Sequence, residues 1–163
     1  MNELTHFSDA GRARMVDVTE KAATHRTAIA SGVLRMRPET LARIRNGSIA
    51  KGDVLTVADV AAVMAAKHTA DIIPMCHTLA LSSVEVLFSD VAEPDAGGYV
   101  GIKVVASTNC VGQTGVEMEA LCAASVALLT IYDMCKAIDR GMRIETIQLE
   151  EKRGGKSGTW LRE

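Results

Sequence analysis

Apolar residues recur along this chain in two different periods, and these periods predict helices and strands. The longest segment of one character covers residues 112–136, GQTGVEMEALCAASVALLTIYDMCK, which opens with a small polar turn and continues as about seven turns of good helix formers. Its middle is apolar almost all round, which is typical of a helix buried against a sheet or another helix. The apolar surface of this helix is expected to comprise Ala120, Leu121, Ala124, Leu128, Leu129, Met134, Cys135 and Ile138.

Two shorter helices are predicted before it. A proline at a first helical position opens a helix over residues 39–45, and an Asn-Gly pair closes it. A second helix is predicted over residues 57–73, with Asp53 or Thr56 as its cap and a proline at its end. Its period turns a set of apolar residues inward, namely Val60, Val63, Met64 and Ala66.

Alternation of apolar and polar residues predicts the strands. They cover residues 26–36, 82–91, 99–110 and 143–149, and a shorter edge strand is predicted over residues 15–19. The second and third of these form a hairpin through a turn that is rich in Pro and Gly. The order of elements predicts an α+β fold, with an antiparallel sheet that carries helices on one face. Its hairpin, long helix and last strand fit a ferredoxin-like arrangement.

The chain has 163 residues, which suits one domain with its own core. Residues 1–14 are polar and predicted to be disordered, residues 15–153 form a single α+β domain, and residues 154–163 form a flexible, Gly-rich basic tail. Aromatic residues make up only 3%, so the core is expected to consist of Ala, Val, Leu, Ile and Met.

Charge and cysteine content narrow the class of protein. The net charge is −2, so no general basic field favours nucleic acid as a partner. The sequence contains no run of eighteen apolar residues, which a membrane span would need, and the first residues do not resemble a signal peptide. The cysteines Cys76, Cys110, Cys122 and Cys135 lack a CxxC spacing. We therefore expect reduced thiols and a cytoplasmic location.

Both ends of the long helix carry charge. Glu117 and Glu119 suit the positive end of the helix dipole, and Asp133 and Lys136 can form an ordinary surface ion pair. Glu119 and Asp133 lie within about 40° of each other around the axis, but about 21 Å apart along it. A small molecule can hardly touch both in one chain. If both ends serve one kind of site, that site draws on two subunits.

Residues 67–77, KHTADIIPMCH, are a second place for chemistry. Adjacent Cys76 and His77 have poor geometry for a shared zinc ion, and no second Cys/His pair lies nearby in the sequence. A nucleophilic cysteine with a histidine base is possible, although such a base normally comes from elsewhere in a fold. A packed cysteine beside a hydrogen-bonded loop histidine explains the pair equally well.

The tail sequence EKRGGKSG resembles a phosphate-binding P-loop at first sight. The pattern needs glycine where Glu150 stands, and too few residues come after it for a helix. The tail is therefore either a solvated terminus or a mobile arm whose Lys152 and Lys156 close over an anion. Lys51 and Arg26 are further candidates for anion binding. No glycine-rich fingerprint for a nicotinamide cofactor is present.

These segments, in this order, resemble the cyclic pyranopterin monophosphate synthase family of molybdenum cofactor biosynthesis. The resemblance covers nearly all of residues 15–158, and TGVEMEAL and IYDMCKA are its most specific blocks. It implies a cytoplasmic lyase with a ferredoxin-like catalytic domain that needs no metal or organic cofactor. It also implies a homohexamer, built as a trimer of dimers, with sites at a subunit interface. The implied substrate is a cyclised dihydro-GTP from an upstream radical enzyme, and the products are cyclic pyranopterin monophosphate and pyrophosphate.

The resemblance also implies roles for individual residues. Its catalytic residues correspond to Asp133, Lys136, Lys67 and Lys51. Its substrate-binding residues correspond to Met75, Cys76, His77, Glu117, Met118 and Glu119, and its basic tail corresponds to Lys152 and Lys156. Arg26, a candidate for anion binding, is added to this substrate-binding set. The sequence departs from the family pattern at Thr78, where proline is expected, and at residues 68–71, which replace a bulkier stretch. Both departures affect the shape of the loop and leave the catalytic groups in place.

The implied chemistry suits these residue types. A triphosphate that loses pyrophosphate needs several cations, which the lysines can supply. Rearrangement of the purine ring needs proton transfers, for which a lysine with its pKa lowered by neighbouring cations, beside an aspartate, is a plausible pair. The rival classes are a non-catalytic oligomer that binds a nucleotide or phosphate as a scaffold, and a P-loop GTPase, which Glu150 disfavours.

Overall fold

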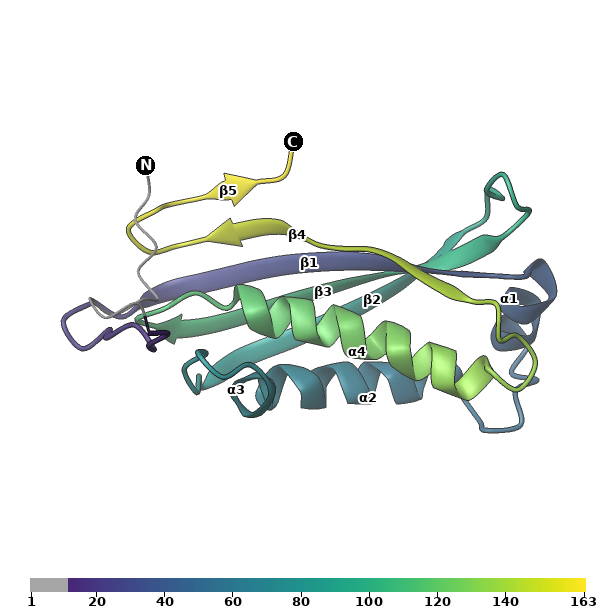
Figure 1. Ribbon diagram of the computed structural model, residues 1–163, viewed down its shortest axis with the longest axis horizontal. Coiled ribbons are helices and arrows are strands. Elements are labelled where there is room, and N and C mark those ends of the chain that lie inside the picture. The colour runs from purple at the N-terminus through teal and green to yellow at the C-terminus, as the bar shows by residue number, and fades with distance from the viewer. Residues whose placement is uncertain (1–11) are drawn as a thin grey trace.

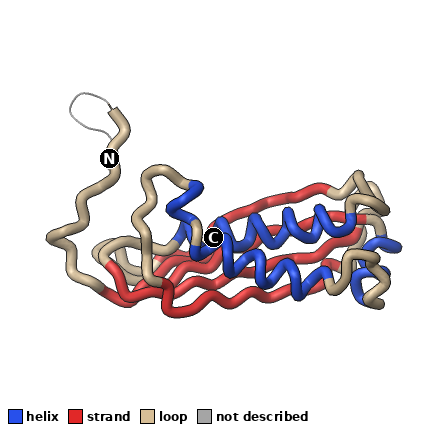
Figure 2. The backbone as a smooth tube through the Cα atoms, turned by 90° about the horizontal axis from the view of Figure 1, so that it is seen from below, coloured by secondary structure: helices blue, strands red, loops and turns tan. Residues whose placement is uncertain are grey.

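A five-stranded antiparallel sheet with helices on one face makes up the protein, as Figures 1 and 2 show. The computed structural model describes residues 12–163. The elements in chain order are β1 Thr24–Met36, α1 Pro38–Arg45, α2 Val54–Lys67, α3 Thr69–Ile72, β2 Leu81–Val91, β3 Val100–Gly112, α4 Glu117–Cys135, β4 Arg143–Arg153 and β5 Trp160–Leu161.

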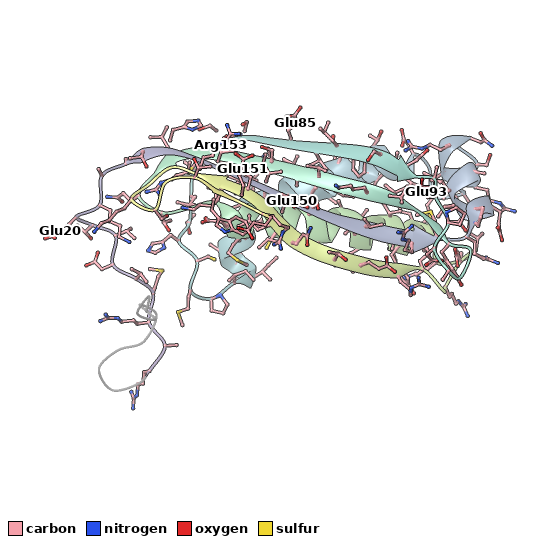
Figure 3. The ribbon with its side chains drawn as sticks, turned by 90° about the horizontal axis from the view of Figure 1, so that it is seen from above. Glu20, Glu85, Glu93, Glu150, Glu151 and Arg153 are labelled. Carbon is pink, nitrogen blue, oxygen red and sulfur yellow. The ribbon has the colours of Figure 1, made fainter. Side chains whose placement is uncertain are left out.

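The strand order is β2-β3-β1-β4-β5, with β1 at the centre. β1 pairs antiparallel with β3 on one side and with β4 on the other, and β2 pairs antiparallel with β3. α2 lies in the crossover from β1 to β2, and α4 in the crossover from β3 to β4. This is the β-α-β-β-α-β order of a ferredoxin-like fold, so the predicted fold class is confirmed. The other face of the sheet, seen in Figure 3, carries none of the helices that residues 12–163 form.

The buried sides of α2 and α4 are rich in alanine. The two helices lie side by side and run in opposite directions across the sheet (Figures 1 and 2). Small side chains let the two helix axes approach closely. The buried alanines are Ala58, Ala62, Ala65 and Ala66 on α2, and Ala120, Ala123, Ala124 and Ala127 on α4. The antiparallel contact places the start of α2 beside the end of α4.

α4 is also long and apolar enough to cross a membrane by length and composition, the one such helix within residues 12–163. Half of its most apolar window is buried inside the protein. The central helix of a soluble core passes the same test, and the packing of α4 against the sheet and α2 accounts for its composition.

Several predicted inward positions prove to be exposed. Leu129 is 54% exposed, and Val60 and Met64 on α2 are 60% and 49% exposed. A helix that is apolar on most sides does not reveal by its period which side meets the core, and alanines, not larger residues, fill the contact here. α2 also ends earlier than predicted, at Lys67, and His68 separates it from α3. Its predicted cap is confirmed, since the Asp53 side chain accepts from the Thr56 backbone N–H at 3.1 Å.

One element predicted near the start of the chain is absent from the described residues. The edge strand predicted over residues 15–19 is wrong, because this segment is irregular and ends in a turn. In that turn Asp17 accepts from the Thr19 backbone, and Lys21 N–H donates to the Val18 carbonyl at 2.9 Å. Of the predicted disordered residues 1–14, residues 1–11 lie outside the described part of the chain. In the predicted flexible tail, β5 pairs with β4 opposite Glu151 and Lys152.

Two neighbouring leucines on α4 provide a test of the packing. Leu128 is fully buried, whereas Leu129 is half exposed. Leu128→Ala is expected to lower the free energy of unfolding by about 3 to 5 kcal/mol, because it opens a cavity between helix and sheet. Leu129→Ala, the same change one residue along, should cost about 0.5 kcal/mol or less. Urea unfolding at equal protein concentration measures both, and equal losses would contradict this placement of α4.

Candidate active site

Three of the four predicted catalytic residues meet at the end of α4. Asp133 lies in the last turn of α4, and Lys136 comes directly after that helix. The Lys136 ammonium lies 2.6 Å from one carboxylate oxygen of Asp133. Lys51, from the loop between α1 and α2, donates to the other oxygen and to the backbone carbonyl of Asp133, both at 2.8 Å. One carboxylate therefore holds two ammonium groups from different parts of the chain.

The two lysines determine the ionisation of Asp133. Hydrogen bonds from Lys136 and then Lys51 lower the pKa of Asp133 to about 2. The hydrogen bond to Asp133 raises the pKa of Lys136. Lys136 therefore does not have the lowered pKa that was expected of a lysine in this cluster, because its bond to the carboxylate favours the protonated form. Exposed ion pairs of this kind add little to stability. Their convergence is better explained as a charged group prepared for a ligand or for proton transfer.

The opposite end of the molecule holds a basic cavity of about 1010 Å³, within the size of small-molecule sites. Its lining residues come from the start of β1, the loop before α4 and the glycine turn after β4. These segments lie at the same end of the molecule (Figure 1). Glu117 is the single carboxylate among the described residues that line it. The cationic side chains of its wall are Lys21, Arg26, Lys152, Arg153 and Lys156. This excess of positive charge suits a polyanionic ligand such as a phosphate chain.

Arg26 organises this wall. Its guanidinium donates to the carbonyls of Gly112 and Gln113, at 3.2 and 3.3 Å, and so holds the loop that leads into α4. The turn at Gly154 and Gly155 wraps over the same side chain, and both glycines have positive φ, 94° and 72°. A Cβ at Gly154 would overlap the backbone carbonyl of His25, so only glycine fits at that position. Strand β5 comes after the turn, in place of the helix that a P-loop requires.

A smaller cavity of about 350 Å³ adjoins the basic one, and Glu117 lines both. Glu119 lines it although its side chain is only 4% exposed. Burial raises the pKa of Glu119, and the nearby charge of Glu117 raises it further. The remaining predicted substrate-binding residues gather here as well: Met75, Cys76, His77 and Met118. The cavity thus presents one poorly solvated carboxyl group among mostly uncharged side chains.

Cys76 and His77 take different roles in this cavity. Burial, and then the charge of Glu119, raises the pKa of the Cys76 thiol. A raised pKa disfavours the thiolate, so the geometry does not support a nucleophilic cysteine. His77 has its Nε2 atom 2.9 Å from the Val16 carbonyl, so Nε2 carries the hydrogen and donates it. This bond holds the irregular N-terminal segment against the cavity.

Comparison with known proteins identifies the family of this chain. The sequence matches the MoaC family over residues 15–155. The chain belongs to the MoaC family. A relative from Novosphingobium aromaticivorans is 60% identical over 98% of both chains, and one from Chloroflexus aurantiacus is 56% identical over 99% of this chain and 96% of its own. One from Listeria monocytogenes is 54% identical over 99% and 98%. Each of these relatives is named cyclic pyranopterin monophosphate synthase.

Within this MoaC chain, Lys67 stands apart from the other predicted catalytic residues. Lys67 is the last residue of α2, whereas Lys51 lies in the loop just before that helix begins. The length of the helix therefore separates the two lysines by about 20 Å. Lys67 is exposed and is absent from the walls of both cavities. The antiparallel helices place it instead at the end of the molecule that holds the start of α4. In one subunit Lys67 therefore cannot act with Asp133.

Sequence reasoning missed part of the candidate site. Lys21 and Thr114 line both cavities, and Val16 and Val18 line the smaller one. Thr24 lines the larger cavity, and its buried hydroxyl has no hydrogen-bond partner among the described residues. The missed residues sit in loops or at the start of β1, where no period marks them. The one signal in the sequence was the pair of cations Lys21 and Arg26 on either side of the start of β1.

The two lysines on Asp133 make a prediction about its titration. Lys136→Met removes the largest cause of the low pKa, so the pKa of Asp133 should rise from about 2 towards its ordinary value. Lys67→Met, at the far end of α2, should leave it unchanged. Carbon-13 NMR of the Asp133 carboxyl group during an acid titration measures both variants. An unchanged Asp133 pKa in Lys136→Met would refute the ion pair.

Proposed function

We propose that this protein is a cyclic pyranopterin monophosphate synthase. It converts (8S)-3′,8-cyclo-7,8-dihydroguanosine 5′-triphosphate to cyclic pyranopterin monophosphate and releases pyrophosphate, a lyase step of molybdenum cofactor biosynthesis. The names of its 54–60% identical relatives support this activity. The observation that carries the proposal is the pairing of Lys51 and Lys136 on Asp133, together with a basic cavity next to a small one that contains a buried carboxyl group.

Each cavity suits one part of this substrate. The triphosphate carries several negative charges, which Lys21, Lys152 and Lys156 can neutralise in the larger cavity. The guanine-derived ring carries N–H donors, and Glu119 offers a carboxyl acceptor in the smaller cavity. Because the two cavities adjoin, one molecule can place its ring in one and its phosphates in the other.

Asp133 and its two lysines are proposed to carry out the chemistry. Lys136 holds its proton at neutral pH and can donate it during the ring rearrangement, while ionised Asp133 fixes its position. In the cyclisation a substrate hydroxyl oxygen bonds to the α-phosphorus, the bond from that phosphorus to the pyrophosphate oxygen breaks, and the hydroxyl proton is released. Lys51 is suited to stabilise the charge that develops on the phosphate oxygens.

A complete site is proposed to combine two subunits. Glu119 and Asp133 lie fourteen residues apart on one helix, about 21 Å along its axis, too far for one substrate to touch both. The exposed apolar residues Val57, Val60 and Met64 of α2, with Leu129 of α4, offer surface for contacts between copies. We propose a cytoplasmic homohexamer, built as a trimer of dimers, in which the Asp133 end of one subunit faces the cavities of its neighbour.

The direct test is turnover of the cyclised dihydro-GTP by the purified protein. Pyrophosphate release and the pterin product, followed by its fluorescence after oxidation, are expected with this substrate and not with GTP. Lys136→Ala is expected to abolish turnover and to leave the oligomer intact, because it removes the proton donor. Substrate binding without turnover by the wild-type protein would favour a non-catalytic scaffold. Near-normal turnover by Lys136→Ala would reject the role of that lysine.

Subunit mixing tests the shared site. Glu119→Gln and Asp133→Asn chains, each inactive alone, are expected to regain about a quarter of wild-type activity when exchanged at equal amounts, since that fraction of sites receives both native residues. The matched control mixes Asp133→Asn with Lys136→Ala, whose defects lie at the same end of the chain and cannot complement. Mass spectrometry of labelled chains verifies the exchange. No recovery after verified exchange would place the whole site within one subunit.

A further inference from the structure

Asp139 is a buried carboxylate in the turn after α4. Its side chain is only 3% exposed. One oxygen accepts from the Arg37 backbone N–H at 2.9 Å and from the Thr40 hydroxyl at 3.0 Å. The other accepts from the Gly141 backbone N–H at 3.2 Å and lies 3.4 Å from the Arg37 guanidinium. Burial of a charge is costly unless it is paired and hydrogen-bonded, and Asp139 meets both conditions.

These contacts join two chain segments that are distant in the sequence. Arg37 precedes the first residue of α1 and provides no side-chain cap to that helix, so Asp139 caps α1 from outside. The Arg37 guanidinium in turn donates to the Ile138 carbonyl. α1 leads directly into the loop that carries Lys51, and the turn that holds Asp139 comes directly after Asp133 and Lys136. The Asp139 contacts therefore clamp together the two segments that meet at the ion-paired cluster.

Cys135 provides independent support for this proximity. This thiol is fully buried at the last residue of α4. The pKa of Cys135 is raised to about 11, mainly by burial and also by the charge of Asp139, while the charge of Lys51 acts in the opposite direction. Asp139 and Lys51 thus both lie within electrostatic reach of the same buried sulfur atom.

We propose that Asp139 is a positioning residue that holds the Lys51 loop against α4, so that Lys51 reaches Asp133. The inference rests on the proposed function for its effect on turnover, but the geometry that it predicts can be measured without substrate. The competing explanation is that the packing of α2 on α4 alone places Lys51. The two explanations predict different positions of Lys51 once the Asp139 contacts are weakened and the helices are left untouched.

Asp139→Asn tests this clamp. The variant keeps the shape of the side chain but replaces one accepting oxygen with a donating NH₂ group. Both oxygens of Asp139 accept hydrogen bonds, so in either orientation the NH₂ group faces another donor and those bonds are lost. We expect kcat to fall by about ten- to a hundredfold, with KM nearly unchanged because the cavities lie at the other end of the chain. In a Lys51→Ala background the same change should have little further effect on kcat, because the residue whose position it controls is already absent.

Asp95→Asn is the matched control. Asp95 likewise accepts from two backbone N–H groups, those of Gly97 and Tyr99, and pairs with an arginine, Arg143. It lies in the turn between β2 and β3, and these partners do not belong to the cluster around Asp133. Its change should leave kcat within about twofold of wild type. If Asp139→Asn fails to fold, Thr40→Val removes one donor only, and a smaller loss of kcat in the same direction is expected.

The readout that does not depend on activity is the titration of Asp133. In Asp139→Asn or Thr40→Val its pKa should rise from about 2, because Lys51 no longer stays on the carboxylate. An unchanged Asp133 pKa, or full additivity of Asp139→Asn with Lys51→Ala, would overturn the inference and favour helix packing alone. An inactive wild-type protein would refute the proposed function, whereas the Asp133 titration would still decide the role of Asp139.

Discussion

The close antiparallel contact between α2 and α4 is the constraint on which the rest of this structure depends. Alanines on both helices let their axes approach, and both helices then pack on one face of the sheet. The start of α2 comes to lie beside the end of α4, which brings the loop before α2 near Asp133. Lys51 of this loop donates to Asp133 at 2.8 Å, across 82 residues of sequence. The end of α2 comes to lie with the start of α4, beside both cavities.

The same contact divides the candidate site between the two ends of the subunit. Cations and the buried Glu119 gather around the start of α4, whereas Asp133 with its lysines occupies the other end. A rigid helix cannot bring its ends together, so under the proposed function each subunit would contribute two separate parts of the site. The proposed assembly, in which unlike ends face each other, would join these parts without any conformational change and would place exposed Lys67 near the Asp133 of a neighbour.

Much of the fold could be predicted from the sequence, because its strands alternate clearly and its long helix has one continuous character. The antiparallel sheet, the helices on one face and the Asp53 cap arise from local patterns. The exposure of Leu129 and Val60 could not be predicted, since the sequence of an almost uniformly apolar helix does not show which of its faces meets the core. The strand predicted over residues 15–19 is wrong because five alternating residues are a weak signal. Hydrogen bonds of the Asp17 side chain form a turn there instead.

The candidate site shows the same limit. Asp133 and Lys136 are three residues apart at the end of one helix, so their contact is local and predictable. The convergence of Lys51 and the clamp at Asp139 depend on tertiary packing, which no local pattern encodes. The loop residues that complete the cavities, such as Lys21 and Thr114, become visible only once β1 and the segment before α4 are placed together.

The directions of the pKa shifts at Asp133 and Lys136 limit which proton transfers these two residues can perform. With a pKa of about 2, Asp133 is fully ionised at neutral pH and is a weak base. Lys136, with a raised pKa, keeps its proton there and is an acid. A bound triphosphate adds negative charge, which strengthens the hold of every nearby lysine on its proton. The cluster is therefore suited to deliver a proton to the substrate, and for Lys136 to act as a base its interaction with Asp133 must first be weakened, by burial against a second subunit or by movement of the carboxylate.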